Sequence, residues 1–129
     1  MARQYYPVLD GRKNRLKELK RLELRDRNTL IPSQLLTSAS KLEWISLDGN
    51  YIPVLTPYLL RNKKRLSFLS LSECEIEAVL DSTFIETKKL EFLILKNNNL
   101  KQITAGQLKG LESLNYIGKL RVVTLEHWN

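Results

Sequence analysis

Cysteine and histidine, which often act in catalysis or bind metal ions, are scarce in this chain of 129 residues. Cys74 is the only cysteine and His127 the only histidine, so no Cys/His cluster has the spacing of a metal site. The phosphate-binding motifs G-x-G-x-x-G and G-x-x-x-x-G-K-S/T are absent from the sequence. We therefore predict no catalytic residue, no cofactor and no metal ion, and we expect a protein that is not an enzyme.

Three glutamates, Glu73, Glu75 and Glu77, alternate along one segment. Carboxyl groups that act as general acids or bases stand in a cleft close to a substrate, and nothing in the sequence implies a cleft. We interpret these three side chains as part of a solvated face.

Asn50, Cys74 and Asn98 recur at one constant interval, and each follows a predicted strand. A primary amide has two donors and an acceptor, so it can satisfy backbone groups that a turn leaves unpaired. We predict a structural Asn/Cys ladder at these positions. Cys74 is accordingly interpreted as a buried structural thiol rather than as a nucleophile or a metal ligand.

Four aromatic side chains could bind a partner, because Trp44, Phe68, Phe92 and Tyr116 recur at the same interval as the ladder. In an extended strand alternate side chains point to opposite faces, and these four fall on the outward face. The candidate binding surface comprises Arg21, Arg25, Trp44, Ser46, Asp48, Phe68, Ser70, Ser72, Phe92, Ile94, Lys96 and Tyr116. Exposed apolar strips often mark binding sites. Alternatively, the rings stack across strands and stabilise the sheet.

The elements that must position these side chains form a repeat that fits L-x-x-L-x-L-x-x-N/C-x-L. Three copies begin at Leu42, Leu66 and Leu90, and a second apolar row recurs at the same interval at Leu36, Leu60, Phe84 and Leu108. Within the first copy Ile45 and Leu47 point to the same face, inward. A lone copy buries too little apolar surface to fold, so we expect the copies to stack.

We predict a single domain over residues 1–129, with three full repeats over 42–113. Residues 16–41 form a degenerate first repeat, one residue short, and 114–129 a degenerate last turn that is either distorted or lacks residues. Residues 1–15 are an N-terminal cap or are disordered. A basic amphipathic helix is the alternative for the first repeat, but the spacing of Leu22 and Leu24 favours a strand.

A 24-residue unit with Phe84 as its nineteenth residue resembles the typical class of the leucine-rich repeat family, found in Toll-like receptor ectodomains and small leucine-rich proteoglycans. The resemblance implies an α/β-type, right-handed solenoid of about 4–5 repeats, with a concave parallel β-sheet and an irregular convex side. It also implies a non-catalytic protein–protein recognition module that binds through the concave sheet.

The resemblance suggests an extracellular protein or a cell-surface ectodomain. However, we predict no signal peptide in this chain, and its sequence has no cysteine pair, no N-x-Ser/Thr site and no apolar run long enough to span a membrane. Because the cysteine-rich caps of extracellular members are also absent, we expect an uncapped fragment of a larger receptor or adhesion protein. The compartment and the oligomeric state are left open.

The net charge of +7 is concentrated in residues 1–41, which hold ten basic and four acidic side chains. The alternative basic patch comprises Arg12, Lys13, Arg15, Lys17, Lys20, Arg21, Arg25 and Arg27. Such a patch could bind nucleic acid or a sulfated glycan electrostatically. It could equally be a solvated face, because its charge lies at one end of the chain and not along a groove.

Overall fold

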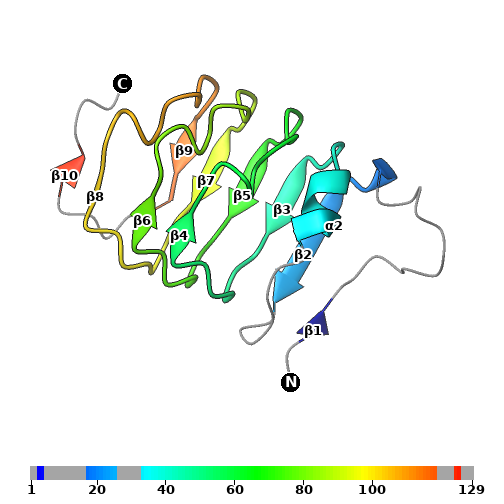
Figure 1. Cartoon of the computed structure of the whole chain (residues 1–129), viewed down its shortest axis with the longest axis horizontal. Coiled ribbons are helices and arrows are strands. Elements are labelled where there is room, and N and C mark those ends of the chain that lie inside the picture. Colours follow the sequence, from blue (N-terminus) through cyan, green and yellow to red (C-terminus); the bar gives the residue numbers. More distant parts are fainter. Residues whose placement is uncertain (1–2, 5–16, 26–32, 119–123, 126–129) are drawn as a thin grey trace.

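Strands that recur once per repeat lie side by side in the structure, a computed structural model that describes residues 3–4, 17–25, 33–118 and 124–125. The chain winds as a solenoid of about four turns (Figure 1). Six strands form one sheet in the order β1-β2-β3-β5-β7-β9. Their bounds are Arg3–Gln4 for β1, Arg21–Arg25 for β2, Trp44–Ser46 for β3, Phe68–Ser70 for β5, Phe92–Ile94 for β7 and Tyr116–Ile117 for β9.

The register of the parallel strands explains the repeat length. Ile45 of β3 pairs with Leu69 of β5, which pairs with Leu93 of β7, so neighbours in the sheet are one full repeat apart. In the first repeat Leu22 of β2 pairs with Ile45, and the interval between these two is one residue shorter than a full repeat. Residues 21–25 are therefore a strand, and the amphipathic-helix alternative is wrong over these residues.

The N-terminal edge of the sheet is covered by β1, which pairs with β2 in antiparallel orientation at Arg3↔Arg25 and Gln4↔Leu24. An uncovered edge strand exposes unpaired backbone groups and invites association with other chains. The predictions for residues 5–15 lie outside the described residues.

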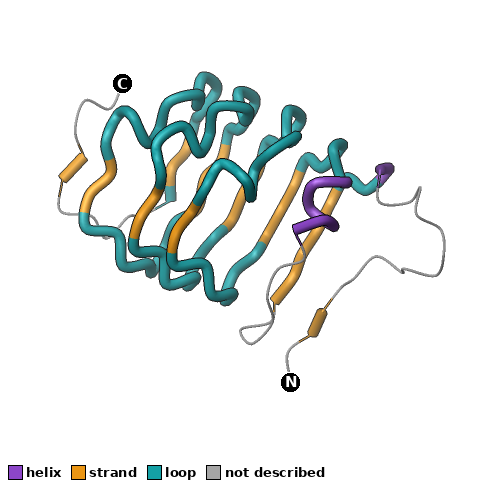
Figure 2. Tube along the Cα trace, viewed as in Figure 1, coloured by secondary structure: helices purple, strands orange, loops and turns teal. Residues whose placement is uncertain are grey.

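The opposite side of each turn carries shorter elements (Figure 2). They are helix α2 at Ser33–Ser38 and strands β4 at Val54–Leu55, β6 at Ala78–Val79, β8 at Gln102–Ile103 and β10 at Thr124–Leu125. Strand β4 pairs with β6 and β10 with β8, all in parallel. We call the outward face of the six-stranded sheet the concave face, and the side with α2, β4, β6, β8 and β10 the convex side.

The last turn continues the solenoid over the residues that the structure describes. Tyr116 pairs with Phe92 at the usual interval, but Thr124 pairs with Gln102 at a shorter one. The last turn is thus two residues shorter at this point than a full repeat. Residues 119–123 and 126–129 lie outside the described part of the chain.

In the turns that follow β3, β5 and β7, one residue has a left-handed backbone conformation. This residue is Gly49, Glu73 and Asn97 in successive repeats. Glycine and asparagine adopt this conformation readily, whereas a glutamate is strained there. The sharp turn is needed because the chain must leave the sheet and cross to the convex side within a few residues.

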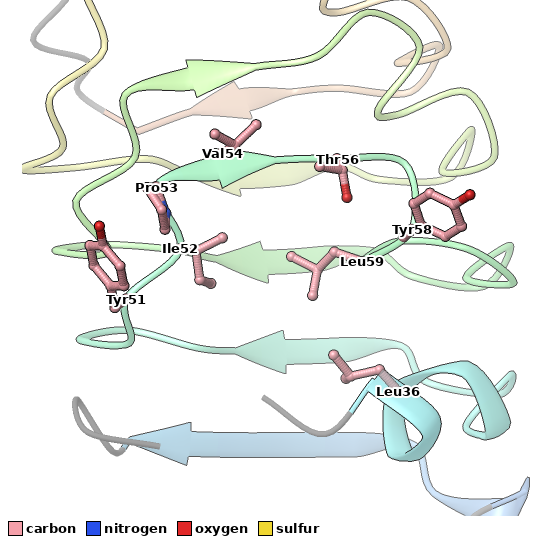
Figure 3. A pocket seen from close by; sticks show the side chains of 8 residues that line it. All are labelled: Leu36, Tyr51, Ile52, Pro53, Val54, Thr56, Tyr58 and Leu59. Atoms are coloured by element: carbon pink, nitrogen blue, oxygen red, sulfur yellow. The ribbon is translucent and has the colours of Figure 1, made fainter. Parts of the chain in front are cut away.

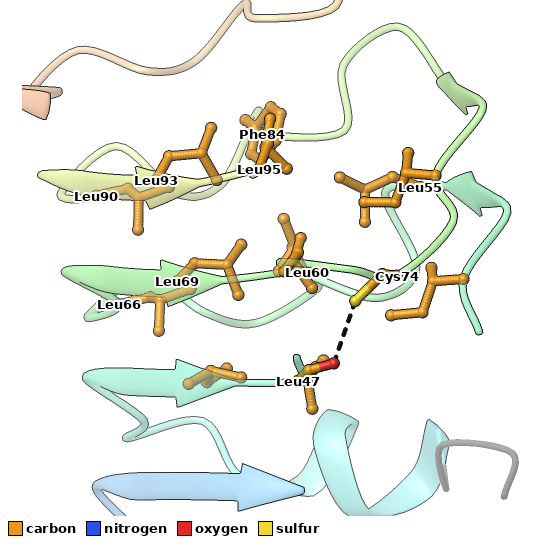
Figure 4. Packing of buried hydrophobic residues seen from close by; sticks show 14 of the residues in the cluster. Leu47, Leu55, Leu60, Leu66, Leu69, Cys74, Phe84, Leu90, Leu93 and Leu95 are labelled. Atoms are coloured by element: carbon orange, nitrogen blue, oxygen red, sulfur yellow. Dashed lines mark hydrogen bonds between the residues drawn. The ribbon is translucent and has the colours of Figure 1, made fainter. Parts of the chain in front are cut away.

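The core consists of apolar rows that run along the solenoid axis between the two sides (Figure 4). Leu42, Leu66 and Leu90 are fully buried, and so is Phe84, the nineteenth residue of its repeat. Each row packs against copies of itself in the turns before and after, so the apolar face of one turn is buried by its neighbours.

A buried lysine interrupts one of these rows. Ala39, Lys63 and Thr87 occupy the same place in successive repeats, and all three are fully buried. The Lys63 ammonium group donates hydrogen bonds to the carbonyl oxygen of Leu36 in α2 and, at 2.9 Å, to that of Arg61. Burial lowers the pKa of Lys63 from 10.5 to about 8, and the nearby Glu86 carboxylate partly opposes this shift.

The depressed pKa of Lys63 predicts a specific pH dependence. Between about pH 8 and pH 10.5 the unfolded chain retains a proton that the folded chain has lost, so the free energy of unfolding rises with pH over this range. We expect Lys63 to contribute about 2–3 kcal/mol of this rise, and Lys63→Met should abolish that contribution. Urea denaturation at both ends of the range measures this contribution.

The exposed neighbour Lys64 supplies the control, since Lys64→Met should retain the wild-type rise in the free energy of unfolding. A rise in Lys63→Met identical to that of the wild type would show that Lys63 does not cause it.

Candidate binding surface

The four aromatic side chains of the concave face form one continuous row across the sheet. Trp44, Phe68, Phe92 and Tyr116 are direct partners in the strand register. The Trp44 and Phe68 rings are stacked, with centroids 4.9 Å apart and an interplanar angle of 3°. The Phe68 and Phe92 rings are tilted, with centroids 6.5 Å apart and an interplanar angle of 39°. The Phe92 and Tyr116 rings are also tilted, with centroids 6.3 Å apart and an interplanar angle of 47°. The sheet therefore holds the rings at contact spacing.

A cation occupies the N-terminal end of the aromatic row. Arg21 pairs with Trp44 in the register of β2 and β3, and its guanidinium carbon lies 3.7 Å from the centroid of the Trp44 ring. This distance is well inside the range of a cation–π interaction. One face of the Trp44 ring is thus covered by Arg21 and the other by Phe68.

Exposure increases along the row toward its C-terminal end. Trp44 and Phe68 are half-buried, whereas Phe92 is 41% exposed and Tyr116 is 50% exposed. The tilted rings cover one another less than the parallel pair does. The N-terminal half of the row is therefore stacked, and the C-terminal half leaves more apolar surface exposed.

The next row of the concave face holds smaller side chains. Ser46 and Ser70 are only 3% and 6% exposed. They belong to the predicted surface but offer a partner little area. Ile94, in the same row, is half-buried and extends the apolar area beside Phe92.

Polar side chains at the carboxyl ends of the strands form the third row. The Asp48 carboxylate accepts hydrogen bonds from the Ser70 hydroxyl at 2.7 Å and from the Ser72 amide at 2.8 Å. Arg25 forms an ion pair with Glu23 at 2.6 Å, and Lys96 is exposed. Asp48 and Arg25 thus already have partners within the protein, whereas the exposed Lys96 is accessible to another molecule.

The Asn/Cys ladder lies beneath the turns that follow these strands. The Asn50 and Asn98 amides each donate to a carbonyl oxygen of the preceding turn, Leu24 and Leu71, at 2.8 Å. The Cys74 thiol makes the equivalent contact with the Leu47 carbonyl at 3.2 Å (Figure 4). Cys74 therefore replaces an asparagine in a hydrogen-bonding role and is not presented to solvent.

Burial also raises the pKa of the Cys74 thiol to about 12. At pH 8 only about one thiol in ten thousand would then be ionised, and the thiolate is the reactive form. We expect a thiol reagent such as Ellman's to label Cys74 at least about 100-fold more slowly in the native protein than in urea. Equal rates in the two conditions would show that the thiol is accessible and not structural.

Half of the predicted basic patch lies within the described residues. Lys17, Lys20, Arg21 and Arg25 are all exposed, but Arg21 stacks on Trp44 and Arg25 is paired with Glu23. Arg12, Lys13, Arg15 and Arg27 lie outside the described part of the chain. Among the four described members of the patch, Lys17 and Lys20 are therefore the two whose side chains form no ion pair or ring contact.

Residues 64–118 match the family model described as leucine-rich repeat. This match supports the assignment of the chain to that family. The matched segment contains β5, β7 and β9 with the aromatic residues Phe68, Phe92 and Tyr116. No curated protein matches the chain.

Leucine-rich repeat domains are generally protein-interaction modules and are typically not catalytic. In this chain, no group of three or more metal-ligating side chains occurs among the described residues. None of the helices in the described ranges is long and apolar enough to cross a membrane.

The convex side of the leucine-rich repeat protein carries a pocket of about 330 Å³ beside α2. Leu36, Ile52 and Leu59 contribute to its lining, and Tyr51 and Tyr58 stand at opposite ends (Figure 3). Tyr58 is 71% exposed and stacks with the guanidinium of Arg61 at 4.5 Å. The residues that line the pocket include no carboxylate, histidine, lysine or cysteine side chain.

Proposed function

We propose that this leucine-rich repeat protein binds a protein partner through its concave face, with the C-terminal half of the aromatic row as the main contact. The observation that carries this proposal is the exposure of Phe92 and Tyr116 on strands whose backbone is fixed by the sheet. Exposed aromatic side chains on a rigid scaffold lose little conformational entropy on binding and are enriched among hot-spot residues.

A steric block on each side of the solenoid tests the proposal. Peptides that bind the full chain are first selected from a phage-displayed random library. Lys96→Cys, on the concave face, and Tyr58→Cys, on the convex side, are then each coupled to a polyethylene glycol maleimide. Cys74 should not react, because it is buried.

We expect the adduct at position 96 to abolish peptide binding and the adduct at position 58 to leave it unchanged. Uncoupled variants control for the substitutions themselves. The proposal fails if the convex adduct blocks binding and the concave adduct does not.

Electrostatic binding of nucleic acid or a sulfated glycan through the basic patch is the second candidate. The exposed Lys17 and Lys20 favour it. It predicts an affinity that falls steeply as salt is added, because bound counterions are released. Salt-insensitive binding of heparin or of an oligonucleotide would exclude it.

A further inference from the structure

We propose that the partner presents a basic and apolar segment, with an arginine or lysine side chain stacking on the C-terminal half of the aromatic row beside Glu91. This inference rests on the proposed function, because it names the chemistry of the partner that the concave face would bind. It follows from two features of that face, an internal cation–π contact and an unpaired acidic row.

The internal contact shows how a cation fits the row. Arg21 lies over Trp44 at 3.7 Å, in the position that a fifth ring would occupy. At the other end, no cation among the described residues stacks on Phe92 or Tyr116, although these rings are the most exposed of the row. The C-terminal half therefore offers, without an internal ligand, the kind of ring face that Arg21 already covers at the N-terminal end.

Charge next to the rings favours a cation over an anion. Glu43, Ser67, Glu91 and Asn115 immediately precede the four aromatic residues in the chain. Backbone hydrogen bonds align them, since the Glu43 carbonyl accepts from Ser67 and the Glu91 carbonyl from Asn115, each at 2.9 Å. Glu43 and Glu91 are exposed, and among the described residues neither has an ion-pair partner. Elsewhere in the same part of the chain, Glu18, Glu23 and Glu112 are paired with Lys41, Arg25 and Lys88.

The two ends of β7 differ in sign, and this sets the direction of the partner. Glu91 precedes the strand, whereas the exposed Lys96 follows it. A cationic side chain is therefore favoured at the Glu91 end, and the apolar part of the segment at Phe92 and Ile94. A nucleic acid could stack its bases on the same rings, but its phosphates would lie beside unpaired carboxylates and be repelled.

Matched synthetic peptides test the inference with the full chain. The probes are an alternating Arg-Leu peptide, an alternating Glu-Leu peptide of equal length, and single-stranded oligothymidine. Binding is measured calorimetrically for the wild type, for Glu91→Gln and for Glu77→Gln. Glu77 is an exposed glutamate outside the concave face, so its variant carries the same change in net charge.

We expect the Arg-Leu peptide to bind at least about tenfold more tightly than the Glu-Leu peptide. Glu91→Gln should weaken binding of the Arg-Leu peptide about three- to tenfold, and Glu77→Gln should weaken it by less than about twofold. Absence of Arg-Leu binding, equal or tighter binding of Glu-Leu, or equal effects of the two substitutions would overturn the inference. So would oligothymidine that binds the wild type more tightly than the Arg-Leu peptide does.

The two proposals can fail separately. If a peptide binds the concave face, as judged by loss of binding to the Lys96→Cys adduct, but prefers Glu-Leu chemistry, only the partner chemistry is wrong. If the bound peptide is insensitive to that adduct, the proposed function itself is wrong.

Discussion

Replacing Asn98 with alanine is expected to lower the free energy of unfolding by about 3–5 kcal/mol, a large loss for a domain of this size. The Asn98 side chain is 5% exposed. Its oxygen accepts from the amides of Cys74 at 2.9 Å and Ile76 at 3.0 Å. Its nitrogen donates to the carbonyls of Leu71 at 2.8 Å and Leu95 at 3.1 Å.

The loss is large because the substitution leaves these backbone groups in the interior without a partner. A buried unsatisfied donor or acceptor costs about 1–3 kcal/mol, and three of the four groups belong to the preceding turn, so the contact between turns is weakened as well. The matched control is Asn99→Ala, since Asn99 is exposed and should change stability by less than about 0.5 kcal/mol. Urea denaturation of both variants decides the matter; a loss under about 1 kcal/mol for Asn98→Ala would contradict the role of the ladder.

Removing both exposed rings of the row, with Phe92→Ser and Tyr116→Ser together, is expected to weaken binding of a concave-face peptide by about 100-fold, or about 2.7 kcal/mol. These rings supply most of the apolar area that the row still offers, because Trp44 and Phe68 cover each other. Loss of a central aromatic contact costs about 2 kcal/mol or more at an interface. Surface plasmon resonance with the immobilised peptide gives the ratio of affinities.

Tyr58→Ser is the matched control for the double variant, because Tyr58 is an exposed tyrosine on the convex side and also contacts an arginine. It should bind the peptide with wild-type affinity. Circular dichroism must show that the double variant is folded, which we expect because both rings are exposed. Wild-type affinity in the folded double variant would show that the row is a structural stack and not a contact surface.

The arrangement of the sheet could be predicted because the inward positions tolerate only a narrow range of side chains. A polar residue at Ile45, Leu69 or Leu93 would be buried between turns, so the apolar interval in the sequence is also the interval of the register. The strand in the first repeat followed from the same constraint at Leu22 and Leu24. The Asn/Cys ladder was predictable since few side chains can satisfy the turn.

Burial of individual polar side chains could not be predicted from the same pattern. Lys63 stands beside Lys64 and Arg65 in the sequence, yet it is buried and donates a hydrogen bond to the carbonyl of Leu36. The feature of the sequence that could have indicated its burial is its spacing of one full repeat from both Ala39 and Thr87. The low exposure of Ser46 and Ser70 likewise depends on their neighbours in space, which the spacing of residues does not specify.

The central claim is that binding takes place on the concave face at the C-terminal half of the aromatic row. The most direct measurement is a titration of the isotopically labelled chain with a selected peptide, followed by amide chemical shifts. We predict that the largest changes occur in β5, β7 and β9, including Phe92 and Tyr116. Largest changes at Tyr51, Tyr58 and β4, with the concave strands unchanged, would contradict it.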